Sequence, residues 1–496
     1  MAHKTYLAVD LGASSGRHVL GRFDGRMLRL EEVYRFENGP VDVGGRLYWD
    51  FLGQWSHVRR GLRASAVADP NVTSLGVDTW GVDFGLLGRG DELLGNPYHY
   101  RDRRTEGVIE KACGIVPREE IFRHTGLQFM LVNTLYQLLA MKLTGSPLLD
   151  IAETFLMMPD LFHWLLTGVK CNEMTEASTT QFYNPVEGDW ATELIERFSL
   201  PTRILAPIAQ PGTTLGPLRP SLAAESGLQA ARVVLPGSHD TASAVMAVPA
   251  KSQPGQRPDW CYLSLGTWAL MGVESPDPVI NDAVLKLAFT NEGGVGGTVR
   301  LLKNITGLWL VQECRRVWNH AGADLDWDVM TQMSVAAAPL RSFINPDAPE
   351  FAAPGDMPEA IREFCCKTGQ PTPDDRGAVV RCALESLALR FRQVLEMCEQ
   401  LNGRRIETIH AVGGGTKNRL LCQFTADACG RRVVAGPVEA TATGNIMMQA
   451  VAAGDVGSIA EAREIIHRSF PIEEYSPKNT EAWSEAYQRF LKVVSS

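Results

Sequence analysis

The chain has 496 residues, 45% of them hydrophobic and 21% charged, and carries a formal net charge of −9 at pH 7. One hydrophobic core rarely supports this length, so the composition predicts a globular protein of at least two domains. The acidic balance argues against nucleic acid or an acidic membrane as a partner and favours a small ligand in a local site. No apolar run approaches the ~18 residues that a membrane-spanning helix needs.

Cysteine usage and the first residues predict the compartment. The ten cysteines have no short regular spacing and no CxxC pair, which is typical of core thiols in a reducing compartment and not of a disulfide framework. The start, MAHKTYLAVD, has one short apolar segment that ends in aspartate, so it predicts a strand and not a signal peptide. We therefore expect a cytoplasmic protein, with monomer and dimer both open.

The first elements frame a glycine-rich turn. The pattern predicts strands at residues 6–11, 18–23 and 28–36 and a helix at residues 52–67. Between the first two strands, GASSGR lets backbone approach a ligand closely, and its hydroxyls and amides can donate to a phosphate. Asp10, where the first strand ends, is suited to hold a cation. An ordinary glycine hairpin between core strands is the alternative.

The same pattern recurs half a chain later. Residues 261–272 read CYLSLGTWALMG, again an apolar strand, a polar residue, Leu-Gly and a hydroxyl residue. Such an echo suggests two related domains, each contributing a hairpin to one phosphate chain.

A second candidate site follows the first helix. Residues 74–87, SLGVDTWGVDFGLL, predict a strand, a break and a second strand, with Asp78 and Asp83 on either side of the break. Carboxylates beside an aromatic face commonly hold hydroxyl-rich ligands such as sugars. The alternative is a hairpin whose aspartates accept local turn amides. Beyond it we expect a solvated charged turn at YRDRRT, with an ionic cluster near a ligand as the alternative. A helical region follows at residues 118–166, broken at Pro147 and Pro159.

The middle of the chain places an aspartate at a strand end. A loop-rich passage at residues 201–220 precedes an apolar strand at 232–235 and then GSHDTASAV. Asp240 lies between that strand and a helix, where α/β proteins commonly bind ligands. It could instead cap the helix. Residues 249–260 read as a link between domains.

The second half adds polar positions and a triple glycine. Asn304 and Gln312 interrupt an otherwise apolar run, and the proline-rich residues 339–358 are expected at the surface. A helix at residues 381–401 leads to a strand at 408–412 and then to three glycines, against which a base or phosphate could lie. The P-loop pattern GxxxxGK[ST] is absent.

Together these motifs resemble the FGGY family of carbohydrate kinases, which have an actin-like ATPase architecture. The motifs span residues 6–445: VDLGASSGR, GVDTWGVDF, YRDRRT, NTLYQL, GSHDTASAV, LSLGTWALMG, TNEGG, LKNITGLWLVQ, FINPDAPEF, and VGGGTKNRLL with AGPVEATATGN. The resemblance implies an α/β protein of two actin-like (ribonuclease H-like) domains, residues 1–248 and 249–496, that flank a cleft for ATP and sugar.

The resemblance also implies site residues and a reaction. The expected ATP contacts are Ala13, Ser14, Ser15, Gly16, Arg17, Thr267, Gln312 and Gly414. The expected ketose contacts are Gly81, His239, Asp240, Thr241 and Asn304. Asp240 would accept the proton and Asp10 would hold Mg²⁺, in the ATP-dependent phosphorylation of the 1-hydroxyl of L-rhamnulose.

Two alternatives remain. One is a kinase of the same family for another ketose or polyol, of the L-fuculose or xylulose type. The other is an actin-like ATPase that uses nucleotide as a conformational switch. The GVDTWGVDF and HDT motifs argue against the second, since a switch needs no sugar acceptor site.

Overall fold

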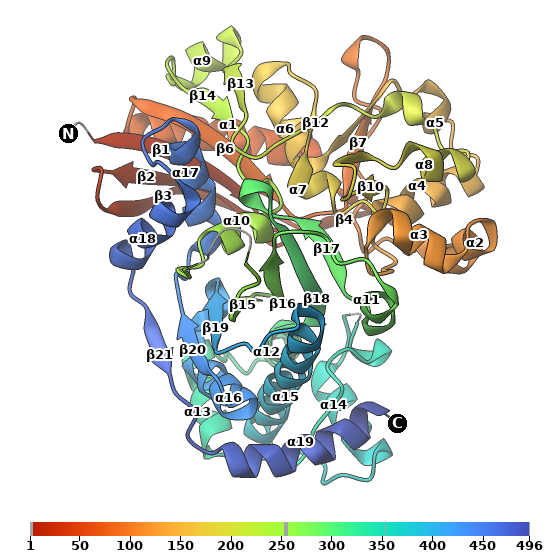
Figure 1. Ribbon diagram of the computed structural model, residues 1–496, viewed down its shortest axis with the longest axis vertical. Coiled ribbons are helices and arrows are strands. Elements are labelled where there is room, and N and C mark those ends of the chain that lie inside the picture. The colour runs from red at the N-terminus through yellow and green to blue at the C-terminus, as the bar shows by residue number, and fades with distance from the viewer. Residues whose placement is uncertain (1–2, 252–255, 353, 496) are drawn as a thin grey trace. The chain divides into compact units, whose positions relative to one another are not determined.

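The computed structural model describes residues 3–251, 256–352 and 354–495. It consists of two compact units: unit 1 comprises Met1–Gln256, Glu274–Leu301 and Ala440–Phe470, and unit 2 comprises Arg257–Val273, Leu302–Glu439 and Pro471–Ser496. Each contains a mixed β-sheet with helices packed on it (Figure 1). The predicted link at residues 249–260 includes residues 252–255, which lie outside the described residues.

The sheet of unit 1 has six strands in the order β13-β14-β6-β1-β2-β3. Their bounds are β1 Lys4–Leu11, β2 Ser15–Phe23, β3 Leu28–Glu37, β6 Val72–Thr79, β13 Thr214–Pro217 and β14 Arg232–Val234. The hairpin of β1 and β2 is antiparallel, whereas β1, β6 and β14 run parallel. The three predicted opening strands are therefore confirmed.

Alternation along β6 shows how both faces of this sheet are covered. Leu75 and Val77 join a core cluster with Val58 of α1 (Phe51–Ala68). The intervening residues, Gly76 among them, face α17 (Ala440–Ala452), whose Asn445 donates a hydrogen bond to Gly76 O. A strand covered on both faces is buried throughout, and β6 has no exposed residue. α17 also packs on β1 and on α10 (Asp240–Met246) (Figure 1).

A second core cluster of unit 1 corrects the helical prediction for residues 118–166. This region contains α3 (Arg118–Thr125), α4 (Thr134–Leu143), α5 (Leu148–Ile151), β8 (Thr154–Met157) and α6 (Met158–Thr167). Pro159 lies in the first turn of α6, where a missing N–H costs nothing, so it starts a helix and does not break one. β8 pairs with β7 (Phe84–Leu87), so β6 and β7 form no hairpin.

Unit 2 repeats the strand order of unit 1. A seven-stranded sheet runs β17-β18-β16-β15-β19-β20-β21, in which β17 belongs to unit 1 and the other strands lie wholly or partly in unit 2. The bounds are β15 Trp260–Leu265, β16 Trp268–Ser275, β17 Thr290–Gly293, β18 Val299–Thr306, β19 Thr408–Val412, β20 Arg432–Ala435 and β21 Glu473–Tyr475. The segment β18-β16-β15-β19-β20 matches β3-β2-β1-β6-β14, with the same parallel pairs after the hairpin. The predicted echo is confirmed, and the chain crosses between units within β16 and β18.

Two predictions for unit 2 have different outcomes. The long helix is confirmed as α15 (Arg376–Asn402), which begins at an Asp375 cap that accepts from Ala378 N at 2.8 Å. The surface prediction for residues 339–358 is wrong in part, because Phe343, Ile344 and Phe351 are fully buried. The prolines interrupt regular structure there, and the apolar side chains between them still enter the core.

The prediction that the cysteines are mainly core residues is confirmed. The ten cysteines are unpaired thiols, and eight of them are buried. Within the described part of the chain, no helix has an apolar stretch long enough to span a bilayer.

Candidate active site

Three aspartates of unit 1 converge where parallel strands end. Asp10 of β1 and Asp78 of β6 are register neighbours. The next residue, Thr79, donates its amide to Ser238 O at 2.8 Å, which joins β6 to the loop before Asp240. The carboxyl ends of parallel strands are the usual ligand side of an α/β sheet. The structure thus brings together Asp10, Asp240 and Asp78, all three of which the sequence offered as candidates.

The charges of this cluster are only partly balanced. Arg17 donates from Nε and Nη2 to Asp10 Oδ2 at 2.9 and 2.8 Å. Burial and the carboxylates of Asp10 and Asp240 raise the pKa of Asp78, although Asn445 donates to its Oδ2 at 2.5 Å. Asp78 Oδ1 is buried and has no hydrogen-bond partner among the described residues. Burial also raises the pKa of Asp240, with His239 opposing and Asp10 adding to the shift.

This chemistry suits a divalent cation held by few protein atoms. Carboxylate oxygens are the ligands that Mg²⁺ prefers, and Mg²⁺ commonly keeps water and phosphate oxygens as its other ligands. Among the described residues, no three His, Cys, Asp or Glu side chains form a ready metal cage. An open acidic site with the orphaned Asp78 Oδ1 therefore fits Mg²⁺ better than a closed site would.

The first glycine turn is a tight hairpin whose glycines have different roles. Gly12 N donates to Ser15 O at 2.9 Å, and Asn38 donates from Nδ2 to Gly12 O at 2.7 Å. A β-carbon at Gly16 would lie 2.2 Å from the Phe36 ring. Packing against Phe36 therefore requires a glycine at position 16, and the contact of Gly16 with ATP stays a prediction. Of the predicted ATP residues of this turn, Ser14 is exposed, and Ala13, Ser15 and Arg17 are half-buried.

Asp240 and its neighbours lie at the start of α10. The capping position belongs to His239, which makes no side-chain cap bond, so the alternative of Asp240 as the helix cap is not supported. The Asp240 side chain is 33% exposed and accepts a hydrogen bond from Thr241 Oγ1 at 3.0 Å. This carboxylate is therefore held on one side and open on another.

The predicted sugar residue Gly81 lies in a strained turn. The following residue, Val82, has φ of 70°, which is rare for a β-branched residue. Three polar side chains hold it: Thr179 accepts from Val82 N, and Thr134 and Gln137 donate to Val82 O. Strain that is over-determined in this way is common at ligand sites. The sequence pattern had no sign of it.

Asp83 is a buried structural residue and not the exposed carboxylate expected of a sugar acceptor. It is fully buried, and its oxygens accept from Trp49 Nε1 at 2.7 Å, Trp80 Nε1 at 3.0 Å and Gln137 Nε2 at 2.9 Å. Most of the groups that donate to Asp83 are remote in sequence. The alternative prediction, that Asp83 accepts from amides of a local turn, therefore does not account for its hydrogen bonds either. Burial raises the pKa of Asp83 to about 6, against these hydrogen bonds. We conclude that Asp83 organises the turn from within.

The predicted solvated turn at YRDRRT is wrong for two of its residues. Asp102 is buried and accepts from Leu47 N at 2.8 Å. Arg104 lies over the Tyr98 ring, 3.6 Å from its centroid, and donates to Gln137 Oε1. Only Arg103 is fully exposed. Since Gln137 also contacts Asp83, this turn supports the Gly81 turn.

Unit 2 brings together the predicted ATP residues Thr267, Gln312 and Gly414. The carbonyl of Thr267 accepts from the amides of Gly307 and Trp309, which join the β15–β16 turn to α12 (Trp309–His320). Gln312 is half-buried in the first turn of that helix. The loop of the triple glycine packs against Leu265 of β15, because a β-carbon at Gly413 or Gly415 would lie too close to Leu265.

Only the middle glycine of the triplet is open. A β-carbon would lie 3.0 Å from Leu265 O at Gly413 and 2.7 Å from Leu265 Cβ at Gly415, but would meet nothing within 4 Å at Gly414. Gly414 is exposed, as expected of a backbone surface for a ligand. Asn304, predicted to contact sugar, is half-buried on β18 in unit 2, whereas Gly81 and residues 239–241 belong to unit 1.

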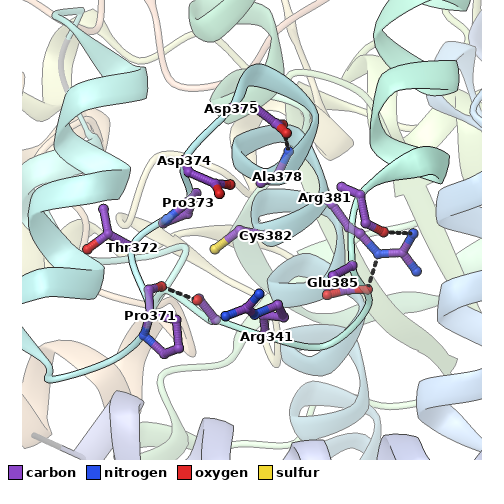
Figure 2. A pocket seen from close by; sticks show the side chains of 13 residues that line it. Arg341, Pro371, Thr372, Pro373, Asp374, Asp375, Ala378, Arg381, Cys382 and Glu385 are labelled. Atoms are coloured by element: carbon purple, nitrogen blue, oxygen red, sulfur yellow. Dashed lines mark hydrogen bonds and ion pairs between the residues drawn. The ribbon is translucent and has the colours of Figure 1, made fainter.

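A further pocket in unit 2 contains none of the predicted residues. It lies at the start of α15 and is lined by Arg341, Pro371, Asp374, Asp375, Arg381 and Glu385, among others (Figure 2). Arg381 donates to Glu385 Oε1 at 2.7 Å, and Asp375 caps the helix. The charges of Arg381 and Glu385 are thus paired with each other.

Comparisons with known proteins show the family to which this chain belongs. Residues 5–247 match the N-terminal domain, and residues 261–453 the C-terminal domain, of the FGGY family of carbohydrate kinases. A rhamnulokinase from Bacteroides thetaiotaomicron is 45% identical over 491 residues, 99% of this chain and 99% of the relative. A rhamnulokinase from Pectobacterium atrosepticum is 40% identical over 492 residues, 99% of this chain and 96% of the relative.

Solved structures match the fold. A xylulose kinase from Lactobacillus acidophilus has a TM-score of 0.83 at 17% identity, covering 99% of this chain and 98% of the other. A gluconate kinase from the same organism has a TM-score of 0.81 at 17% identity, covering 100% and 98%. These identities bear on the fold alone, and they confirm the predicted two-domain α/β class.

Proposed function

Because this chain belongs to the FGGY family of carbohydrate kinases, we propose that it transfers the γ-phosphoryl group of ATP to the 1-hydroxyl of L-rhamnulose, in the cytoplasm, as a step of L-rhamnose catabolism. The names of the relatives that match it over nearly its whole length support this substrate. The observation that carries the chemistry is the convergence of Asp240 with Asp10 and Asp78.

Asp240 is the proposed general base. A sugar hydroxyl is a poor nucleophile until its proton has an acceptor, and a positioned carboxylate supplies one. Burial raises the affinity of Asp240 for a proton, while the exposed third of its side chain leaves it accessible to the hydroxyl. His239, Thr241 and the Gly81 turn are the proposed sugar contacts beside it, and Asn304 is the proposed contact from unit 2.

Nucleotide binding is proposed for both units. The Ala13–Arg17 turn of unit 1, and Thr267, Gln312 and Gly414 of unit 2, supply backbone amides and polar side chains for phosphates and nucleoside. Asp10 and Asp78 would hold Mg²⁺, which neutralises phosphate charge when bound. Arg17 already balances part of the charge on Asp10.

A coupled ADP-release assay tests the proposal. Purified protein is given ATP and Mg²⁺ with L-rhamnulose, L-fuculose or D-xylulose, and without sugar. We expect turnover to require sugar and kcat/KM to be highest for L-rhamnulose. A higher value for another ketose would replace the substrate and keep the enzyme class. Sugar-independent ATP hydrolysis at an undiminished rate would favour the conformational ATPase.

A further inference from the structure

The backbone of His239 is fixed before any ligand binds. Its amide donates to Thr175 Oγ1 at 3.1 Å, and its carbonyl accepts from Ala242 N at 2.7 Å. The side chain is only 10% exposed. The position of the imidazole ring is therefore set by the fold, and what remains to be chosen is which ring nitrogen carries the proton.

Arg300, which no sequence motif indicated, determines which ring nitrogen of His239 carries the proton. It lies on β18 in unit 1, has no exposed side-chain surface, and places Nη2 3.0 Å from His239 Nδ1. Its Nε donates to Gly293 O at 2.8 Å, which holds the guanidinium in place. A guanidinium has donors only and remains charged. His239 Nδ1 must therefore be the acceptor, and the proton of the neutral ring lies on Nε2.

Glu292 balances the buried charge and does not compete for Nδ1. Its Oε2 lies 3.2 Å from Arg300 Nη2 and 3.3 Å from His239 Nδ1. Both contacts are within ion-pair distance, and against the effect of burial Arg300 and His239 lower the pKa of Glu292. Neither contact meets the angles of a hydrogen bond, so Oε2 has no hydrogen-bond partner among the described residues. If Nδ1 carried a proton for Glu292, that N–H would face an N–H of Arg300. An ionised Glu292 instead offsets the cost of burying Arg300.

We infer that Arg300, held by Glu292, is a positioning residue that keeps His239 in the tautomer with Nε2–H facing Asp240. This inference rests on the proposed function for its catalytic meaning. Nε2 lies 3.6 Å from Asp240 Oδ1, too far for a hydrogen bond between them. A sugar hydroxyl placed at both groups would accept from Nε2–H and donate its own proton to Asp240. Arg300 thereby decides the direction in which that proton points.

The other tautomer would act against the reaction. A bare Nε2 would accept the hydroxyl proton and compete with Asp240 for it. In serine proteases, where the histidine itself transfers the proton, a wrong tautomer costs about 10⁴-fold in kcat. Because His239 only orients the hydroxyl, we expect Arg300→Met to lower kcat by more than about tenfold but by less than the roughly 10⁴-fold loss in serine proteases. The KM for ATP should change little.

Arg463→Met is the matched control. Arg463 is also a buried arginine of unit 1 with a buried partner, Glu274, at 2.8 Å. It donates to Val245 O and Met246 O, at the other end of α10 from His239. Its loss should cost similar stability without changing the His239 tautomer or the ratio of kcat to KM.

Nitrogen-15 NMR of histidine-labelled protein, with the His239 signals assigned by a His239→Gln variant, reads the tautomer directly. Wild type and Arg463→Met should show His239 protonated at Nε2, and Arg300→Met should show a mixture. A wild-type ring protonated at Nδ1 would overturn the inference, as would identical His239 spectra and kinetics for the two arginine variants. The wild-type spectrum decides the matter if Arg300→Met does not fold. Absence of ketose kinase activity would overturn the proposed function, while the spectra would still test the tautomer.

Discussion

Asp240 is the residue whose loss should separate chemistry from binding. Asparagine keeps its size and much of its hydrogen bonding but cannot accept a proton. Asp240→Asn should therefore lower kcat by roughly 10²- to 10⁴-fold, toward the lower end for a loose phosphoryl-transfer transition state, with sugar KM changed less than about tenfold. Steady-state kinetics with ATP and L-rhamnulose measure both.

Asp50→Asn is the matched control for this substitution. Asp50 is a true N-cap of unit 1 and accepts from Gly53 N at 3.0 Å. Asparagine caps about as well as aspartate, so stability and turnover should hardly change. If Asp240→Asn kept more than about a tenth of wild-type turnover, outside the usual range for base removal, Asp240 would not be the base, and Asp78 would be the next candidate.

Glu173 should make stability depend on pH in an unusual direction. It is fully buried beneath the site, where Thr175 N and Ser238 N donate to its Oε2, and burial raises its pKa to about 8. A carboxyl whose folded pKa exceeds its unfolded value stabilises the fold most below the unfolded pKa. That contribution is lost as pH rises, by up to about 1.4 kcal/mol per pH unit until the folded pKa is reached.

Glu173→Gln removes this titration and leaves a side chain of the same size. Urea unfolding between about pH 5 and pH 8 should show a decline in unfolding free energy for wild type that is shallower in the variant. Glu187→Gln, on an exposed turn of the same unit, should keep the wild-type slope. Equal slopes for all three proteins would mean that Glu173 is ionised throughout.

At the scale of elements, the loop after β19 should bind ligand through Gly414 alone. Gly414→Val adds a side chain where no protein atom lies within 4 Å, at a φ outside the left-handed region, so the melting temperature should be nearly unchanged. The KM for ATP should rise at least about tenfold, a loss near 1.4 kcal/mol, while the KM for sugar should stay within a few-fold. Equal loss of both affinities would identify the loop as a packing element.

Gly415→Ala is the control on the other side. Its β-carbon would lie 2.7 Å from Leu265 Cβ and 2.9 Å from Leu265 O, so the fold must shift. Differential scanning calorimetry should show a lower melting temperature for this smaller substitution than for Gly414→Val.

The elements also show where sequence reasoning succeeds. β1, β2, β6, α15 and β19 have clear periodicity and turn residues at their ends, and all were predicted. β8 was missed because its four buried residues, TFLM, lie between helices and show no alternation of their own. The buried Phe343 was missed because neighbouring prolines dominate the composition.

The site was predictable where it depends on local motifs. Asp10 lies near the end of a strand before a tight turn, Asp240 begins a helix that follows a strand, and the Gly414 loop lies between a strand and a helix, all patterns visible in the sequence. The partners of Asp83 were not, because Trp49 and Gln137 are 34 and 54 positions away. Arg300 is 61 positions from His239. Only folding brings such pairs together, and no periodicity in the sequence predicts these contacts.

At the scale of the whole molecule, the proposed reaction needs residues of both units on one pair of ligands. Sugar contacts are proposed mainly in unit 1 and the nucleoside loop in unit 2, so binding of both ligands should favour a more compact state. Small-angle scattering with L-rhamnulose and a non-hydrolysable ATP analogue should give a smaller radius of gyration than the free protein. The same radius in every ligand state would contradict this expectation.

The two units share a strand order but differ in the residues at the ends of their central strands. Asp10 and Asp78 end the central strands of unit 1, and their counterparts by register in unit 2 are Ser264 and Val412. Unit 1 has two ionisable carboxyl groups at that edge of its sheet, whereas unit 2 has a hydroxyl group and a hydrocarbon side chain. On the proposed function, this asymmetry is a division of labour: proton and cation chemistry is confined to the acidic copy, and the uncharged edge can hold an anionic ligand without repelling it.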